Sequence, residues 1–185
     1  MYKKDCGVWR LKMGETDVRI IELEDFNMAS ALWFGLSPEI EAWNKLLKWA
    51  GLKGLLEDLG NRRFFGFNNP DPSAGSPNYG YEQWMTGPPG IEGDDEIEIK
   101  EFQGGLYAVI SCQGIENIYP SWQNLVVWCE ESSRDFGSGQ ALEEMLNPEL
   151  FVSSDGSFDS PESAADEFRF NLYLSIVGGW RLHFD

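Results

Sequence analysis

The sequence has few of the residues on which many catalytic and metal sites depend. It contains one histidine, His183, and three cysteines (Cys6, Cys112 and Cys129) without CxxC spacing. A Ser-His-Asp or Cys-His arrangement would have to use His183, and no His/Cys metal site has ligands at a standard spacing. Neither GxxxxGK(S/T) nor GxGxxG follows a predicted strand. We therefore expect no metal, no cofactor and no disulfide framework.

Basic residues and long apolar runs are also scarce. Lys and Arg number 14 against 31 Asp and Glu, which gives a net charge of −17. Because nucleic-acid binding depends on Lys and Arg neutralising phosphates, this balance argues against direct nucleic-acid binding, and also against docking on anionic lipid. No apolar run approaches the ~20 residues that a membrane span needs, and the N-terminus has no signal-peptide core. We expect a soluble, cytoplasmic protein with no nucleic-acid or membrane partner.

Acidic and aromatic residues are abundant instead. Residues 1–92 have a net charge of −3 and residues 93–185 a net charge of −14. A solvated acidic surface would explain this difference, and so would attraction of cations or of a basic protein partner. The 8 Trp, 6 Tyr and 12 Phe are more than a core needs. The length of 185 residues predicts a single domain, residues 1–185.

The chain contains an internal repeat, which appears when the sequence is slid against itself by 79 residues. Seven identities fall in the 32 positions from Val18 to Trp49, and two of them are tryptophan pairs. We infer two copies of one unit, residues 18–86 and residues 97–177. The matching pairs are Ile20 and Ile99, Glu22 and Glu101, Ala29 and Ala108, Gly35 and Gly114, Trp43 and Trp122, Leu46 and Leu125, and Trp49 and Trp128.

Each copy has the pattern strand, helix, strand, strand. In the first copy, a strand at 18–24 and a bend at 25–27 precede an extended run at 29–34. Ser37-Pro38 predicts a helix start with Ser37 as N-cap, and strands follow at 63–68 and 79–86. This pattern predicts the α+β class: a mostly antiparallel sheet with two helices on one face and a pseudo-twofold between the copies. The second copy has predicted strands at 97–102, 106–112, 142–146 and 168–177 and a helix at 120–130.

Two of these strands carry the candidate site. Alternation places Glu82 and Trp84 on one face of the first strand, and Asn171 and Tyr173 on one face of the repeat-related strand. If the copies pack about a twofold, Glu82 and Asn171 lie near its axis. A carboxylate flanked by Trp84 and Tyr173 suits a lipophilic cation, since each ring adds about 0.5–2 kcal/mol of cation–π attraction. The alternative is that Glu82 faces solvent and the rings cover a sheet edge.

The chain resembles the GyrI-like small-molecule-binding domain, which is also the effector-binding domain of AraC-type and multidrug-responsive transcription regulators. The matching pieces are 18–24, the Trp43 helix, 105–109 and 171–176. The resemblance implies two strand-helix-strand-strand units with a ligand groove between them. The 17 residues before Val18 are too few for a helix-turn-helix, so we expect a stand-alone member.

The resemblance also implies roles for particular residues. Drug-sensing members line the groove with aromatic residues and meet cationic ligands with a buried glutamate on the closing strand of the second half. Here the matching position is Asn171, and the acid stands at its first-half counterpart, Glu82. Tyr107 and Tyr173 match the aromatic wall. The ligand-binding residues predicted are Glu82, Trp84, Tyr107, Asn171 and Tyr173, whereas Trp43 and Trp122 are expected in the core.

Three functions follow from these residues. The first is capture of a small lipophilic, cationic aromatic molecule in the groove. The second, implied by stand-alone members with a similar Tyr-Gly-Tyr-Glu strand, is hydrolysis of cyclopropane-bearing or other electrophilic toxins. In that case Glu82 is the catalytic residue that activates water, with a pKa raised by desolvation. The third is an acidic interaction protein, a nucleic-acid mimic such as a gyrase inhibitor. The sequence leaves open whether the protein is an enzyme.

Overall fold

Two similar halves follow one another along the chain. The computed structural model describes residues 4–5, 8–13, 16–132, 134–153, 156–158 and 164–178. The first half contains β4, α1, β5 and β6, and the second contains β8, α2, β10 and β11 in the same order. The elements are β1 (Lys4–Asp5), β2 (Val8–Met13), β3 (Thr16–Leu23), β4 (Phe26–Gly35), α1 (Pro38–Leu52), η1 (Leu55–Asn61), β5 (Phe64–Asn68), β6 (Tyr79–Thr86), β7 (Glu98–Phe102), β8 (Gly105–Gln113), η2 (Ile115–Asn117), α2 (Ile118–Glu131), β9 (Asp135–Phe136), β10 (Leu142–Met145), η3 (Pro148–Leu150) and β11 (Arg169–Val177).

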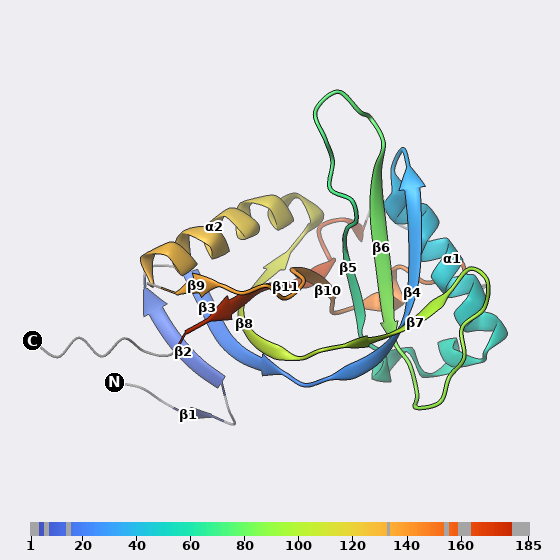
Figure 1. Cartoon of the computed structure of the whole chain (residues 1–185), viewed down its shortest axis with the longest axis horizontal. Helices are drawn as coiled ribbons and strands as arrows, with labels where there is room; N and C mark the ends of the chain where they lie inside the picture. The colour runs from blue at the N-terminus through green and yellow to red at the C-terminus, as the bar shows by residue number, and fades with distance from the viewer. Residues whose placement is uncertain are drawn as a thin grey trace, which may run out of the picture.

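All the strands belong to one curled, antiparallel sheet. Its order is β1-β2-β3-β8-β11-β10-β5-β6-β4-β7, and β9 pairs with β11. The strand that precedes each half pairs with the other half: β3 pairs with β8, and β7 pairs with β4. In Figure 1 the segments β3–β4 and β7–β8 cross the bottom of the molecule and connect its two sides. The predicted α+β class is confirmed, and the pseudo-twofold stays a prediction.

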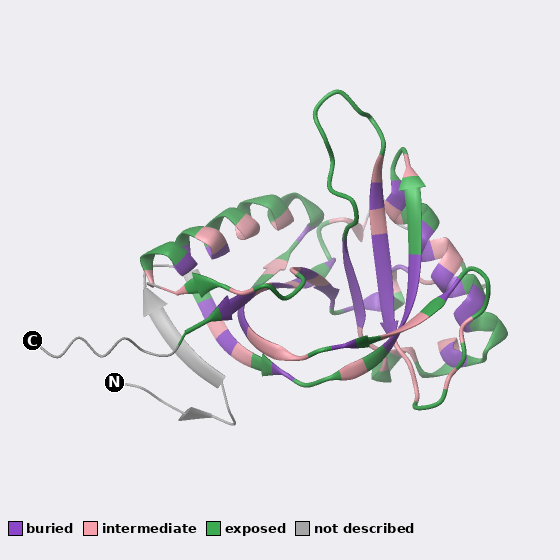
Figure 2. Ribbon diagram, viewed as in Figure 1, coloured by how far each residue is buried: buried purple, intermediate pink, exposed green. Residues whose placement is uncertain are grey.

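The two helices pack on one face of the sheet, as predicted. Trp43 of α1 stacks on Phe64 of β5 at 5.2 Å between ring centroids, and on Phe151 at 6.0 Å. In α2, Leu125 and Trp128 belong to the same buried core. The helical spacing of these residues gives each helix one apolar stripe. In Figure 2 the buried side of each helix faces the sheet. The core position predicted for Trp43 is confirmed.

Some local predictions were wrong or incomplete. Ser37 stands before α1, but its backbone has a φ of 50° and its side chain makes no capping hydrogen bond. Strands β1, β2 and β9 were not predicted, because each is short or precedes the repeat.

No helix in the described ranges is long and apolar enough to cross a membrane. The assignment of residues 1–185 to one domain stays a prediction.

Candidate ligand-binding site

The face of the sheet without helices holds a second buried cluster, rich in aromatic side chains. Phe26 stacks on Phe65 and on Phe102, with ring centroids 5.4 and 4.6 Å apart. Tyr107 and Tyr173 meet edge to face at 6.2 Å. We call this the aromatic cluster; it consists of Leu23, Met28, Phe65, Phe67, Trp84, Phe102, Tyr107, Val109, Leu142 and Tyr173, with Ile21 and Phe26 packed against it.

Strand alternation explains which predicted residues reach this cluster. Trp84 of β6 lies in it, while the next residue, Met85, packs in the core under the helices. Tyr173 of β11 lies in it, while Leu172 is in the helix-side core. The predicted faces of the two strands are therefore confirmed.

Contacts between aromatic rings connect the two halves of the predicted site. Phe102 lies 6.0 Å from Trp84 and 6.2 Å from Tyr107, measured between ring centroids. In the described ranges no hydrogen bond joins Glu82 to Asn171. Their common position near a pseudo-twofold axis stays a prediction.

Four donors surround the carboxylate of Glu82, whose side chain is 2% exposed. Its Oε1 accepts hydrogen bonds from Ser30 Oγ, Trp84 Nε1 and Lys100 Nζ, each at 2.6 Å. Its Oε2 accepts one from Asn69 Nδ2 at 2.8 Å. These donors come from β4, β6, β7 and the loop between β5 and β6, so the carboxylate joins four segments.

The protonation of Glu82 differs from the expectation. Burial alone would raise its pKa, but the hydrogen bonds from Lys100 and the three neutral donors outweigh burial and lower the pKa below its ordinary value. The predicted upward shift is therefore wrong, because the sequence pattern does not reveal donors on other strands. An anion that is bonded at both oxygens and paired with Lys100 is a weak base.

A second buried carboxylate, Glu144 of β10, was missed in the sequence. Arg63 Nε donates to its Oε1 at 2.6 Å, and the Tyr173 hydroxyl donates to its Oε2. Burial raises the pKa of Tyr173, and the charge of Glu144 raises it further, so the phenol remains a donor. Glu144 lies two residues after Leu142, which is in the aromatic cluster. Period-2 alternation from Leu142 is the signal that could have found it.

Asn171 belongs to the polar network around Glu144. Its Nδ2 donates to Glu144 Oε2 at 3.4 Å and to the Tyr173 hydroxyl at 3.3 Å. Its Oδ1 accepts from Arg19 Nη2 at 2.9 Å and from Ser111 Oγ at 2.6 Å. Asn171 therefore holds side chains of β3, β8 and β10 in place beside the aromatic cluster.

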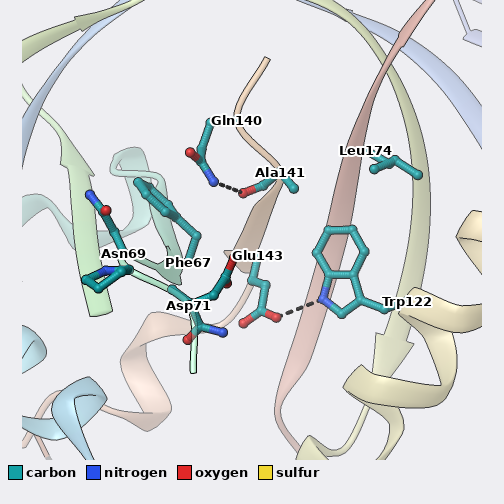
Figure 3. Close-up of a pocket in the computed structure, with 10 residues that line it drawn as sticks. Phe67, Asn69, Asp71, Trp122, Gln140, Ala141, Glu143 and Leu174 are labelled. Atoms are coloured by element: carbon teal, nitrogen blue, oxygen red, sulfur yellow. Dashed lines mark hydrogen bonds between the residues drawn. The ribbon is translucent and has the colours of Figure 1, made fainter. Parts of the chain in front are cut away.

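A pocket of about 580 Å³ opens where β5 ends and β10 begins. In Figure 3, Phe67, Trp122 and Leu174 surround it together with polar side chains. Phe67 also meets Trp84 edge to face at 4.7 Å, and Asn69 is a donor to Glu82, so two residues of the lining contact the predicted site. We call it the Trp122 pocket; its lining is Phe67, Asn68, Asn69, Pro70, Asp71, Trp122, Gln140, Ala141, Glu143 and Leu174.

Trp122 and Glu143 form the polar wall of this pocket. Trp122 was expected in the core; it packs against the helix-side core but is only half-buried. Its Nε1 donates to Glu143 Oε1 at 2.8 Å. Burial raises the pKa of Glu143, and the charge of Glu39 adds to the increase. Among the described residues no Lys or Arg forms an ion pair with Glu143, whereas the other two carboxylates of the site each have one.

The described residues also form smaller pockets. One, of about 430 Å³, is lined by Phe26, Arg63 and Tyr173, among others. The Arg63 guanidinium lies 4.7 Å from the ring of Phe65 and 6.0 Å from that of Phe26, and so covers this side of the cluster. The other, of about 250 Å³, reaches Ser30 and Lys100.

The remaining candidates from the sequence are its histidine and its cysteines. His183 and Cys6 lie outside the described residues. Cys112 and Cys129 are free thiols. In the described part of the chain, no three His, Cys, Asp or Glu side chains are placed to hold a metal ion.

The curled antiparallel sheet carries two helices on one face and an aromatic cluster with buried carboxylates on the other. The family model of the integron-associated effector binding proteins matches residues 19–176, and the chain belongs to this family. The resemblance to GyrI-like effector-binding domains is thereby confirmed. A search of curated protein sequences finds no significant match.

Solved structures share the fold at low sequence identity. The C-terminal domain of EcmrR aligns with a TM-score of 0.61 and 10% identity, covering 90% of this chain and 100% of that domain. In the complex of EcmrR with DNA, the match has a TM-score of 0.60 and 10% identity and covers 88% of this chain. This chain spans 57% of that longer EcmrR chain. A hydrolase from Listeria innocua aligns with a TM-score of 0.60 and 12% identity, covering 86% of this chain and 91% of its own.

Proposed function

We propose that this chain captures a flat, aromatic, positively charged small molecule, which enters through the Trp122 pocket. The observation that carries the proposal is Glu143, a half-buried carboxylate that faces the pocket and has no Lys or Arg ion-pair partner in the described ranges. A cationic ligand would form an ion pair with the Glu143 carboxylate. Glu82 and Glu144 are less suited, because each already has a basic partner.

The size and lining of the pocket support an aromatic ligand. A volume of about 580 Å³ is within the range of ordinary small-molecule sites. Phe67 and Trp122 offer ring faces or edges, and Leu174 adds an apolar contact. Cation–π attraction to two rings contributes about 1–2 kcal/mol in a partly desolvated site.

Two of the five residues predicted from the sequence contact the lining of the pocket. Trp84 supports Phe67, and Glu82 anchors Asn69. Tyr107, Asn171 and Tyr173 hold the opposite side of the aromatic cluster. We assign Glu82 and Trp84 to the support of the pocket lining, because the rest of the aromatic cluster lies on the other face of the sheet from Glu143.

Hydrolysis of an electrophilic ligand is the second candidate function, with Glu143 rather than Glu82 as the general base. Glu143 accepts one side-chain hydrogen bond, from Trp122, and its pKa is raised, so it is the better base for a water molecule in the pocket. In such a step Glu143 takes a proton from water while the oxygen of that water bonds to the electrophilic carbon. The strained ring bond at that carbon breaks, its electron pair stays with the departing atom, and that atom takes up a proton, so that one water molecule is added overall.

Thermal unfolding with a panel of quinolinium, acridinium and phenanthridinium cations tests the proposal. The wild type and Glu92→Gln, an exposed control, should be stabilised by the same compounds, and Glu143→Gln should lose the shift. Mass spectrometry of each hit and of electrophilic analogues decides between binding and hydrolysis, since a water adduct made only by the wild type identifies an enzyme. If Glu143→Gln keeps the full shift, the proposal is wrong.

A further inference from the structure

The end of β4 is an open edge of the sheet. β4 pairs with β6 from Met28 to Gly35, but on its other side β7 pairs with it only as far as Ser30. The chain before β7 turns away, because the Asp94 carboxylate accepts hydrogen bonds from the backbone N–H groups of Glu96 and Ile97, both at 2.9 Å. Among the residues that the structure describes, no strand takes the place of β7 beside residues 31–36, which we call the open edge.

Large apolar side chains cover the open edge. Leu32, Trp33, Phe34 and Leu36 are 47, 43, 58 and 68% exposed. Side chains alternate along a strand, so Leu32 and Phe34 share one face and Trp33 is on the other. In Figure 2 this end of β4 is green beside the purple β6. Proteins usually protect a sheet edge with lysine or proline, and residues 31–36 contain neither.

Acidic side chains flank the open edge at both ends. At one end, a pocket of about 250 Å³ beside Leu32 is lined by four acids and two lysines. At the other end, the first turn of α1 is also acidic. Of the two lysines near that pocket, Lys100 is already engaged by glutamates, which leaves Lys45. The flanking acids are Asp94, Asp95, Glu96 and Glu98 at the first end and Glu39 and Glu41 at the second.

We propose that the open edge binds an extended, basic segment of a partner polypeptide by strand addition. Main-chain groups of the segment pair with those of residues 31–36, and its alternate apolar side chains lie against Leu32 and Phe34. Lys and Arg at its ends face the acidic flanks. A second copy of this chain is a poorer match, because antiparallel pairing of two open edges places the acids before β7 of one copy against the acidic first turn of α1 of the other.

The test is a fluorescence-anisotropy titration with a labelled peptide in which Val alternates with Thr and both ends carry Lys and Arg. The wild type should bind it, and Phe34→Ser should weaken binding about tenfold or more. Leu52→Ser should bind as the wild type does, because Leu52 is 82% exposed at the end of α1, away from the open edge.

Control peptides separate strand addition from nonspecific adhesion. A peptide with Glu in place of Lys and Arg should bind far more weakly. Two further versions of the basic peptide carry N-methyl groups on alternate residues, one at the odd positions and one at the even positions. The version whose methylated nitrogens would pair with the open edge should lose binding. The proposal is overturned if the basic peptide does not bind, if the acidic peptide binds equally well, or if neither methylated peptide is weakened. It is also overturned if sedimentation equilibrium shows a wild-type dimer that Phe34→Ser dissociates, since a second copy then occupies the edge.

Discussion

Replacing Lys100 by Met should destabilise the protein in a way that depends on pH. Lys100 Nζ lies 2.6 Å from Glu82 Oε1, and the two side chains are 32% and 2% exposed. Loss of a hydrogen bond to a charged group costs about 1.5–3 kcal/mol, and three neutral donors remain on Glu82. We expect a loss of about 2 kcal/mol at neutral pH, or roughly 4–8 °C in Tm for a chain of this size.

The pH dependence follows from the direction of the pKa shift. The pKa of Glu82 is lowered by folding, so its contribution to stability is present above the unfolded value of about 4.3 and is lost as the pH falls through the folded value. Lys100→Met raises that folded pKa. The difference between variant and wild type should therefore be largest at pH 7 and shrink as the pH falls through the lowered folded pKa of Glu82.

Urea unfolding at a series of pH values measures this difference. Lys48→Met, which removes an exposed lysine of α1, is the matched control and should change stability little. In a Glu82→Gln background, Lys100→Met should cost much less. A loss for Lys100→Met that stays equal over the whole acid range in which the protein is still folded would refute the reasoning, because the interaction would not depend on an ionised Glu82.

The remaining predictions concern other parts of the site. Gly80→Ala should lower the free energy of unfolding by about 1–3 kcal/mol, because a Cβ there overlaps the backbone of Asn69, whose side chain donates to Glu82. Gly60→Ala has open space around it and should be tolerated in the same urea assay. Arg63→Met should cost about 1–2 kcal/mol, since it removes a partly exposed partner of the buried Glu144. Glu143→Gln should raise Tm at pH 7 without ligand. The pKa of Glu143 is raised by folding, so its charge destabilises the folded state above that pKa. The gain in Tm should therefore vanish at acid pH.

The strands and their faces could be predicted from the sequence because alternation and the repeat are local patterns. β6 spans residues 79–86 as predicted, and Trp84 and Tyr173 lie on the predicted faces. The α1 stripe likewise identified Trp43 as a core residue. These patterns depend on neighbours within one strand or helix.

The charged partners of the site could not be predicted in the same way, since they come from separate strands. Lys100 and Ser30 reach Glu82 from β7 and β4, and these contacts reverse the expected pKa shift. Glu143 and Glu144 are adjacent in a strand of four residues, and each faces a different side of the sheet. In an acidic half of the chain, such a pair resembles a solvated surface.

The most direct test of the central claim compares the affinity of N-methylquinolinium with that of its neutral isostere 1-methylnaphthalene by calorimetric titration. The wild type should prefer the cation by roughly 10- to 100-fold, as expected for about 1.5–3 kcal/mol from a partly desolvated charge. Glu143→Gln should bind both compounds with similar affinity, and Glu92→Gln should keep the wild-type preference. Equal affinities in the wild type, or a cation preference that survives in Glu143→Gln, would contradict the account.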